Sequence, residues 1–429
     1  MKSKKTENNL LLKYMDFSIN SSQNQSEYMN VMVNVCSTML NLLKHENLII
    51  DLNYNPSEFW PKAKHKTVAF VDGGLARNNL FNSSPLAIRA GSYVVNKKLK
   101  EEAFDTNLKF VLNLFDKQNE LFDFIEDESF ESLMLTKKKD AARIITEAGQ
   151  LVNHILTKRK IDLCFLHGPI QAVLTPFVQE GFPPFTNLAI QSIVPSYKKK
   201  NMSIDDRHFI NVYYECIKLI KNAPYPIYGV LETAISSAYT RNLLYAFKKK
   251  GLLSQKDYDE TINVIKEYRI TDNNIFEVIL KKNQALKPLE IQKQFYGSKI
   301  IQKSRWDEKI IEYPNVFVGF IKVNDFQSPI RIESYNYPKN LVNDFSYILA
   351  VSKLLPSYSY PVGLHVVDRF VKIPQWMKKA SKNYWSTHAL KSVMNNQNKG
   401  PNSLVLKYIS NKNRTWANRP KNKGGRIET

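Results

Sequence analysis

The sequence predicts an α/β fold in which helices flank a mixed central sheet. Two observations predict it: apolar, β-rich runs alternate with segments of helical periodicity, and 43% of the 429 residues are apolar, enough for a sizeable core. No internal repeat and no obvious linker interrupts residues 25–390. We therefore expect one large domain over residues 25–390, after a polar lead of residues 1–24 and before a basic tail of residues 391–429.

The first expected element is an amphipathic helix over residues 26–46, whose apolar side suits core packing or a dimer contact. A buried strand follows at KTVAFVDGG, residues 66–74, and its Asp-Gly-Gly end predicts a tight turn. LAIRAGSYVVNKK, residues 86–98, is expected to form a second strand. We expect the acidic stretch 101–131 to be a solvated helical insertion, because its charge breaks the basic background.

The central part of the chain repeats a helix-then-strand pattern. Helices are expected at 140–160, 207–223 and 235–251, and strands at IDLCFLHGP, residues 161–169, and YPIYGVLE, residues 225–232. Three further strands are expected at 297–304, 314–323 and 328–334, followed by helices at 338–355 and 362–376.

The net charge of +21, from 61 Lys and Arg against 40 Asp and Glu, indicates a polyanionic partner or an acidic protein surface. Residues 369–429 hold 14 Lys or Arg and one acid, so they carry +13 and leave +8 to the remainder. Tryptophans and tyrosines stand among these cations, a combination that suits base stacking and phosphate neutralisation. A solvated Lys/Asn-rich tail or an acidic protein partner would fit the same pattern.

No stretch approaches the roughly 18 apolar residues of a membrane span, and the first residues do not resemble a signal peptide. We therefore expect a cytoplasmic protein that does not bind membranes. The three cysteines, Cys36, Cys164 and Cys216, lack metal-ligand spacing and are expected to be reduced and buried.

Three polar residues stand at the carboxyl ends of expected strands: Asp72, His167 and Glu232. Such ends converge in a crevice of an α/β sheet, and a carboxylate followed by two glycines leaves room for a metal ion and a phosphate. An Asp that only caps a turn, and a His hydrogen-bonded at a strand end, are the structural alternatives. No P-loop, dinucleotide fingerprint, zinc cluster or GxSxG elbow is present.

The motif order resembles that of the NurA family of DNA-end-processing nucleases, in a divergent bacterial form. The likeness covers about residues 65–378, through VAFVDGG, DLCFLHGP, YPIYGVLETAISSAY, YRITDNNIFEVIL, SPIRIE and YPVGLHVVDRFVKIP. The resemblance implies an RNase H-like core, a two-fold homodimer and DNA cleavage with Mn²⁺ or Mg²⁺. It also implies work with a HerA-type hexameric ATPase-translocase in DNA repair or anti-phage defence.

The resemblance also implies site residues. Asp72 matches the first metal-binding Asp and Asp272 a later acidic position, while the helical Glu falls best on Glu147, with Gln150 competing for the register. Three positions depart from the family: His167 replaces an Asp, Glu232 replaces a Lys, and Val367-Asp368 replaces Ala-His. We expect Asp72, Glu147, His167 and Asp272 to be catalytic, and Asp72, Glu147, His167, Glu232 and Asp368 to hold metal.

Two interpretations of these departures compete. Either the ligands have been lost and the protein is an inactive NurA-like dimer that guides DNA on a HerA ring, or His167 and Asp368 have exchanged places and the site is active. An imidazole ligand would favour Mn²⁺ over Mg²⁺. Arg89, Lys97, Lys372 and Lys378 are the candidates for binding the DNA backbone. A transposase or integrase relative is a third possibility, which the late motifs disfavour.

Overall fold

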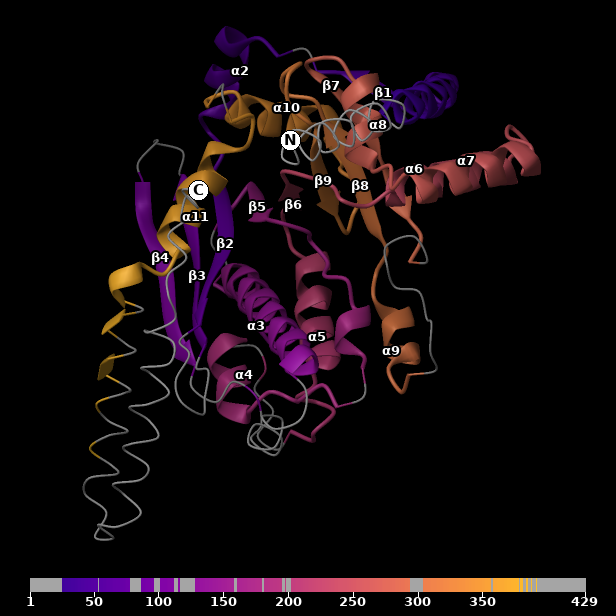
Figure 1. Ribbon diagram of the computed structural model, residues 1–429. Helices are drawn as coiled ribbons and strands as arrows, with labels where there is room; N and C mark the ends of the chain where they lie inside the picture. Colours follow the sequence, from indigo (N-terminus) through magenta and orange to yellow (C-terminus); the bar gives the residue numbers. More distant parts are fainter. Residues whose placement is uncertain are drawn as a thin grey trace, which may run out of the picture.

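The structure, a computed structural model, describes most of residues 25–377 (Figure 1). The described ranges are 25–77 without 53, 86–95, 101–111, 115, 128–157, 160–179, 181–194, 197, 202–293, 304–355 and 358–377, with six positions between 379 and 391. The expected lead of residues 1–24 and nearly all of the basic tail lie outside them.

A mixed sheet organises the described chain, with the strand order β1-β7-β8-β9-β6-β5-β2-β3-β4. The strands are β1 Ile49–Asp51, β2 Val68–Arg77, β3 Leu86–Val95, β4 Glu101–Val111, β5 Leu163–His167, β6 Ile227–Leu231, β7 Gln284–Ile291, β8 Val316–Ile321 and β9 Ile330–Ser334. Strands β2, β5 and β6 run parallel, and every other pairing is antiparallel. The predicted α/β class with a mixed sheet is confirmed.

Helices cover both faces of this sheet (Figure 1). They are α2 Pro56–Ala63, α3 Glu128–Leu156, α4 Asn187–Ile193, α5 Phe209–Lys221, α6 Ala238–Lys249, α7 Gln255–Glu267, α8 Asp272–Ile279, α9 Asp307–Glu312, α10 Leu341–Ser352 and α11 Val362–Val371, with a 3-10 turn η2 at Thr175–Phe177. A further helix spans residues 25–45.

The central strands are apolar on both sides because each separates two cores. Side chains alternate along a strand, so Ala69 and Val71 of β2 enter the core under α3 and α5. Val68 and Phe70 enter the second core, under α10 and α11. Strand β5 divides its residues in the same way. The register of each strand therefore decides which face of the sheet each of its side chains points to. The same rule applies to the polar residues at the strand ends.

Two consecutive glycines of β2 allow helices to approach from opposite faces. A Cβ on Gly73 would lie 2.6 Å from Cγ of Glu147 on α3, and one on Gly74 would lie 2.0 Å from the carbonyl oxygen of Val371 on α11. The expected turn at Asp-Gly-Gly is wrong, because β2 continues through both glycines to Arg77, paired with β3. The glycines serve helix packing rather than a reversal of the chain.

The helix of residues 25–45 fulfils the expected role in the core. Its buried side chains, Met32, Val35, Cys36, Met39 and Leu43, join the core on the α3 side. All three cysteines are buried and free, as expected.

Other expectations differ from the structure. Residues 101–111, expected to be helical, form β4, where Phe104, Leu108 and Phe110 follow the two-residue period of a strand. No strand was expected at β1 or β7, although both lie in the sheet. The strand expected at 297–304 falls almost wholly outside the described residues. Among the described helices, none is both long and apolar enough to cross a membrane.

The close approach at Gly74 gives a first test. Gly74→Ala should lower the free energy of unfolding by about 1–3 kcal/mol, since the added methyl group meets a backbone carbonyl and must push α11 away from β2. Urea denaturation would measure the change. The control is Val342→Ala on α10, where the side chain is 52% exposed and the expected change is within about 0.5 kcal/mol. A Gly74→Ala protein as stable as its parent would contradict this packing.

Candidate metal centre

Three strand ends bring polar side chains to one edge and one face of the sheet. Because β2, β5 and β6 are parallel and adjacent, Asp72 and His167 lie at the same level, and Glu232 lies two residues beyond Val230, the partner of His167 on β6. Phe70, Phe165 and Val230, each two residues earlier, all belong to the core under α10 and α11. Side-chain alternation therefore points all three polar residues towards that same face.

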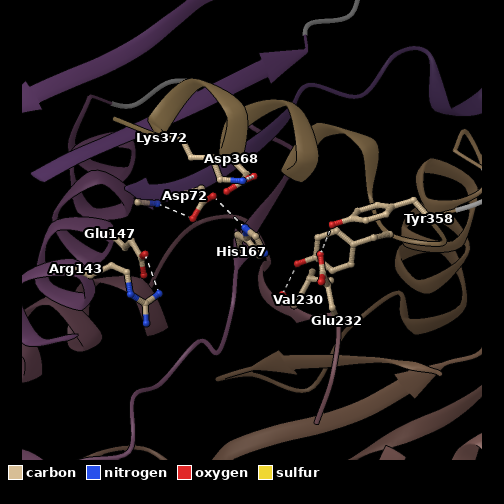
Figure 2. A network of polar contacts seen from close by, with 11 residues as sticks. Asp72, Arg143, Glu147, His167, Val230, Glu232, Tyr358, Asp368 and Lys372 are labelled. Carbon is tan, nitrogen blue, oxygen red and sulfur yellow. Dashed lines mark hydrogen bonds and ion pairs between the residues drawn. The ribbon is translucent and has the colours of Figure 1, made fainter. Parts of the chain in front are cut away.

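Asp72 and His167 are in direct contact (Figure 2). The ring nitrogen Nδ1 of His167 donates to Oδ2 of Asp72 at 3.0 Å, while the backbone N–H of Gly73 donates to Oδ1 at 2.7 Å. Asp72 is 5% exposed, and its Cα partner on β3 is Gly91, which leaves space beside the carboxylate. In the neutral ring this tautomer leaves Nε2 as the free acceptor, the arrangement common in metal-binding histidines.

Asp368, on a helix that packs on the sheet, completes a compact group with Asp72 and His167. It lies on α11, and one ligand atom each from Asp72, His167 and Asp368 fall within 4.8 Å of one another. Lys372, one turn later, forms an ion pair with the Asp368 carboxylate. The expected DNA-binding residue Lys372 thus lies at the group itself (Figure 2).

Glu147 reaches the same place from α3. Its side chain packs against Gly73 and is buried, and its Oε1 accepts from the guanidinium of Arg143 at 3.2 Å. Figure 2 shows the Glu147 carboxylate near Asp72 and the Arg143 guanidinium on the far side of Glu147. Arg143 was absent from the predicted site, although the Arg-to-Glu spacing of four residues on a predicted helix is the signal that indicates such a pair.

Glu232 lies on the opposite side of His167 from Asp72 (Figure 2). Its Oε1 accepts from the Tyr358 hydroxyl at 2.7 Å, and it is not one of the three residues grouped within 4.8 Å. Tyr360 contacts the imidazole, with ring centroids 5.4 Å apart, and its hydroxyl donates to the Val230 carbonyl at 2.7 Å. Tyr358 packs in turn against Tyr360, with ring centroids 6.1 Å apart.

Opposing effects set the proton affinities at the site. Burial alone would lower the pKa of His167, but the hydrogen bond and charge of Asp72, with the charges of Glu232 and Asp368, raise it. Burial raises the pKa of Glu147 to about 7, against the lowering effect of Arg143. The charge of Glu147 raises the pKa of Arg143, which stays protonated. The site therefore holds excess negative charge that cations relieve.

The donor set fits a divalent ion. Two carboxylates and one imidazole, converging from β2, β5 and α11, are the ligand types that Mn²⁺ and related transition ions accept. Glu147 is not part of this group, but it lies near enough to Asp72 for the charge of Asp72 to raise its pKa. A protonated His167 cannot bind a metal, so protons would compete with the ion.

The structure does not bring Asp272 to this group. Asp272 is completely buried, and its carboxylate accepts from the backbone N–H groups of Tyr239 and Thr240 at 3.0 and 2.9 Å and from the Thr240 hydroxyl at 2.7 Å. These donors belong to the first turn of α6, whose free N–H groups need acceptors. Asp272 is also not one of the residues whose ligand atoms lie within 4.8 Å of those of Asp72 and His167. We therefore leave Asp272 out of the site.

Of the remaining residues expected to bind DNA, one lies next to the site and two lie outside the described residues. Arg89 lies on β3 directly opposite Gly74, next to the site, and its Nε is buried with no hydrogen-bond partner among the described residues. Lys97 and Lys378 lie outside the described residues. Glu333, which was not among the residues expected at the site, forms an ion pair with Arg331 at 2.7 Å inside the sheet.

The sequence was compared with known protein families and structures. The model of the NurA domain family matches residues 66–373. None of the curated proteins matches the chain. The NurA nuclease from Sulfolobus solfataricus is 11% identical, with a TM-score of 0.46 over 84% of this chain and 95% of that one. A NurA bound to dAMP and manganese is 8% identical, with a TM-score of 0.41 over 90% and 99%.

Burial of Glu147 predicts a pH dependence of stability. The pKa of Glu147 is raised from 4.5 to about 7 on folding, so the folded protein binds the extra proton between these values and loses stability as pH rises through them. In EDTA, the wild type should lose up to about 3 kcal/mol more than Glu147→Gln between about pH 4.5 and 7.5.

Urea denaturation across this pH range measures the difference. Glu260→Gln, at an exposed glutamate of α7, is the matched control and should keep the wild-type slope. If the free energy of unfolding changed with pH equally in the wild type and Glu147→Gln, burial would not raise the pKa of Glu147.

Proposed function

The chain belongs to the NurA family, and from this premise we propose that it is a divalent-metal-dependent DNA nuclease. The observation that carries the proposal is the convergence of Asp72, His167 and Asp368, whose ligand atoms lie within 4.8 Å of one another. Three metal-binding side chains from separate elements, with a buried Glu147 and two cations beside them, form a site suited to phosphodiester hydrolysis rather than a fold-stabilising ion pair.

Asp72, His167 and Asp368 would hold the ion, and Glu147 would be the additional carboxylate. When bound, the ion supplies a more acidic water and stabilises charge on the phosphate oxygens. Manganese is the cofactor we favour, because the site includes an imidazole. One solved NurA is bound to dAMP and manganese and another to manganese, which agrees with that choice.

The protein's own groups orient the site. The Gly73 N–H and the His167 ring fix both oxygens of Asp72, so this carboxylate loses little freedom when an ion binds. Arg143 and Lys372 stand on opposite helices and balance part of the acidic charge. Either cation can turn to a phosphate oxygen once a metal ion has taken over its carboxylate.

DNA would be held mainly through its backbone. Arg89 on β3 and Lys372 on α11 lie next to the metal group, and Lys97, Lys378 and the strongly basic residues 369–429 would extend the contact. Phosphate neutralisation gives little sequence preference and a steep salt dependence. Glu232, held by Tyr358, would act as an outer carboxylate that keeps His167 oriented and basic.

The assembly we propose is a homodimer that works with a HerA-type hexameric ATPase on DNA ends, in repair or anti-phage defence. Membership of the NurA family supports it. If the site were inactive, the same assembly would leave the protein as a DNA-guiding scaffold on the ring, and cleavage assays separate the two roles.

Asp72→Asn should abolish metal-dependent cleavage of linear DNA, because it removes one ligand charge and replaces one of the two oxygens that accept from Gly73 and His167 with an NH2 group. A decrease of at least about a hundredfold is expected. The stabilisation of the folded protein by Mn²⁺, measured as a rise in Tm, should be lost as well.

Asp259→Asn on α7, an exposed carboxylate, is the matched control and should keep both cleavage and the rise in Tm. Cleavage by Asp72→Asn at the wild-type rate would place the active site elsewhere. If the wild type does not cut with Mn²⁺ or Mg²⁺, with or without a HerA-type ATPase, yet binds the ring, the scaffold role holds.

His167→Asp should move metal preference towards Mg²⁺, because it makes the three-residue ligand set all oxygen. The ratio of cleavage rates in Mn²⁺ and Mg²⁺ should fall by about tenfold or more relative to wild type. Asp368→Glu, which keeps the ligand type, is the control. An unchanged ratio in His167→Asp would show that the imidazole is not a metal ligand.

A further inference from the structure

A pocket of about 240 Å³ lies beside the metal group, on the α3 side of the sheet. Its walls come from α3, the end of β5, the loop that follows β5, and α5. Ile144, Leu151, Phe177 and Tyr213 form apolar walls, and Asp140 and Arg143 supply polar groups. This pocket has no part in the arrangement of Asp72, His167 and Asp368 described above.

Glu147 connects the pocket to the metal group. It lines the pocket, yet it also packs on Gly73, the residue next to Asp72. Arg143 is close enough to Asp72 for that charge to raise its pKa, and its side chain is 39% exposed. A group held in the pocket would therefore adjoin Glu147 and Arg143, the two residues that link the pocket to Asp72.

The size and walls of the pocket restrict the kind of ligand that it can bind. Pockets for drug-sized ligands span roughly 300–1,000 Å³, so this one suits a single flat ring system better than a whole nucleotide. Apolar and aromatic walls favour the faces of such a ring. A carboxylate and a guanidinium offer, respectively, an acceptor and several donors to its edge.

We propose that this pocket receives the base of the nucleotide whose phosphate lies at the metal group. The inference rests on the proposed nuclease function. It deepens that function by making the nucleotide base, and not only the DNA backbone, part of the substrate that the enzyme recognises.

The polar groups also give the pocket a preference. Asp140 accepts hydrogen bonds from exocyclic amino groups, which adenine, guanine and cytosine carry and thymine lacks. Arg143 donates to ring nitrogens and carbonyl oxygens, which every base offers. Thymine should therefore be the weakest occupant, and a nucleotide without a base should gain nothing from the pocket.

Val173→Trp tests the proposal by filling the pocket from its rim. Val173 lines the pocket and is 46% exposed, so the indole can enter without disturbing a packed core. Leu188→Trp on α4, 81% exposed and outside the pocket, is the matched control. Calorimetry of the full chain with Mn²⁺ would compare dAMP, dGMP, dCMP and dTMP with 2-deoxyribose 5-phosphate.

The wild type and Leu188→Trp should bind dAMP about tenfold more tightly than the sugar phosphate, with dTMP between them. Val173→Trp should bind dAMP and the sugar phosphate equally. A second experiment tests whether the pocket also binds a base of DNA. A terminal abasic site in a DNA substrate should slow cleavage by the wild type about tenfold and leave cleavage by Val173→Trp unchanged.

Equal binding of dAMP and the sugar phosphate by the wild type would overturn the proposal, as would an unchanged preference in Val173→Trp. If cleavage still depends on Asp72 in that case, the nuclease function stands and only the base pocket is wrong. Base-dependent binding without any metal-dependent cleavage would support the pocket and overturn the nuclease function.

Discussion

The close packing of two helices on opposite faces of β2 is the constraint on which the site depends. Adjacent residues of a strand point to opposite faces, so Gly73 admits α3 and Gly74 admits α11. The first helix brings Glu147 and the second brings Asp368 to the strand that carries Asp72. A Cβ at either glycine would move one of these helices outward. The two glycines after Asp72 are thus the local reason that side chains from three layers converge.

The convergence of these carboxylates causes electrostatic repulsion, which the surrounding cations reduce in part. Asp72, Glu147 and Asp368 lie near one another, and Arg143, His167 and Lys372 each contact one of them. Burial removes the water that would otherwise screen this charge, so the pKa of Glu147 rises to about 7. A divalent ion would relieve the repulsion among the carboxylates more directly than side-chain cations do. The same charge that favours a metal ion also favours protonation of His167, so ion and proton compete for one group.

The sequence predicted the parts of this site that depend on local rules. Polar residues at the ends of parallel strands converge, and Asp72, His167 and Glu232 do share one face of the sheet. Asp272 could not be excluded from sequence, because its face depends on how α6 and α8 pack on a distant part of the sheet. Strand β7 was missed for a related reason: it is defined by pairing with β8 and β1 rather than by a strong local pattern. Long-range pairing decides what local periodicity leaves open.

The positions of His167 and Asp368 explain how a site could exchange two ligands and keep its chemistry. One ligand atom from each of the two residues, on β5 and α11, lies within 4.8 Å of the other and of an Asp72 oxygen, so an imidazole and a carboxylate that exchanged places would still meet at one group. The proposed exchange would change the support of each group. The imidazole stands on a central strand between Asp72 and the ring of Tyr360, whereas the carboxylate stands on a helix within reach of Lys372. As metal ligands, the imidazole would have the more rigid support, and the carboxylate would have a cation to neutralise it until an ion binds.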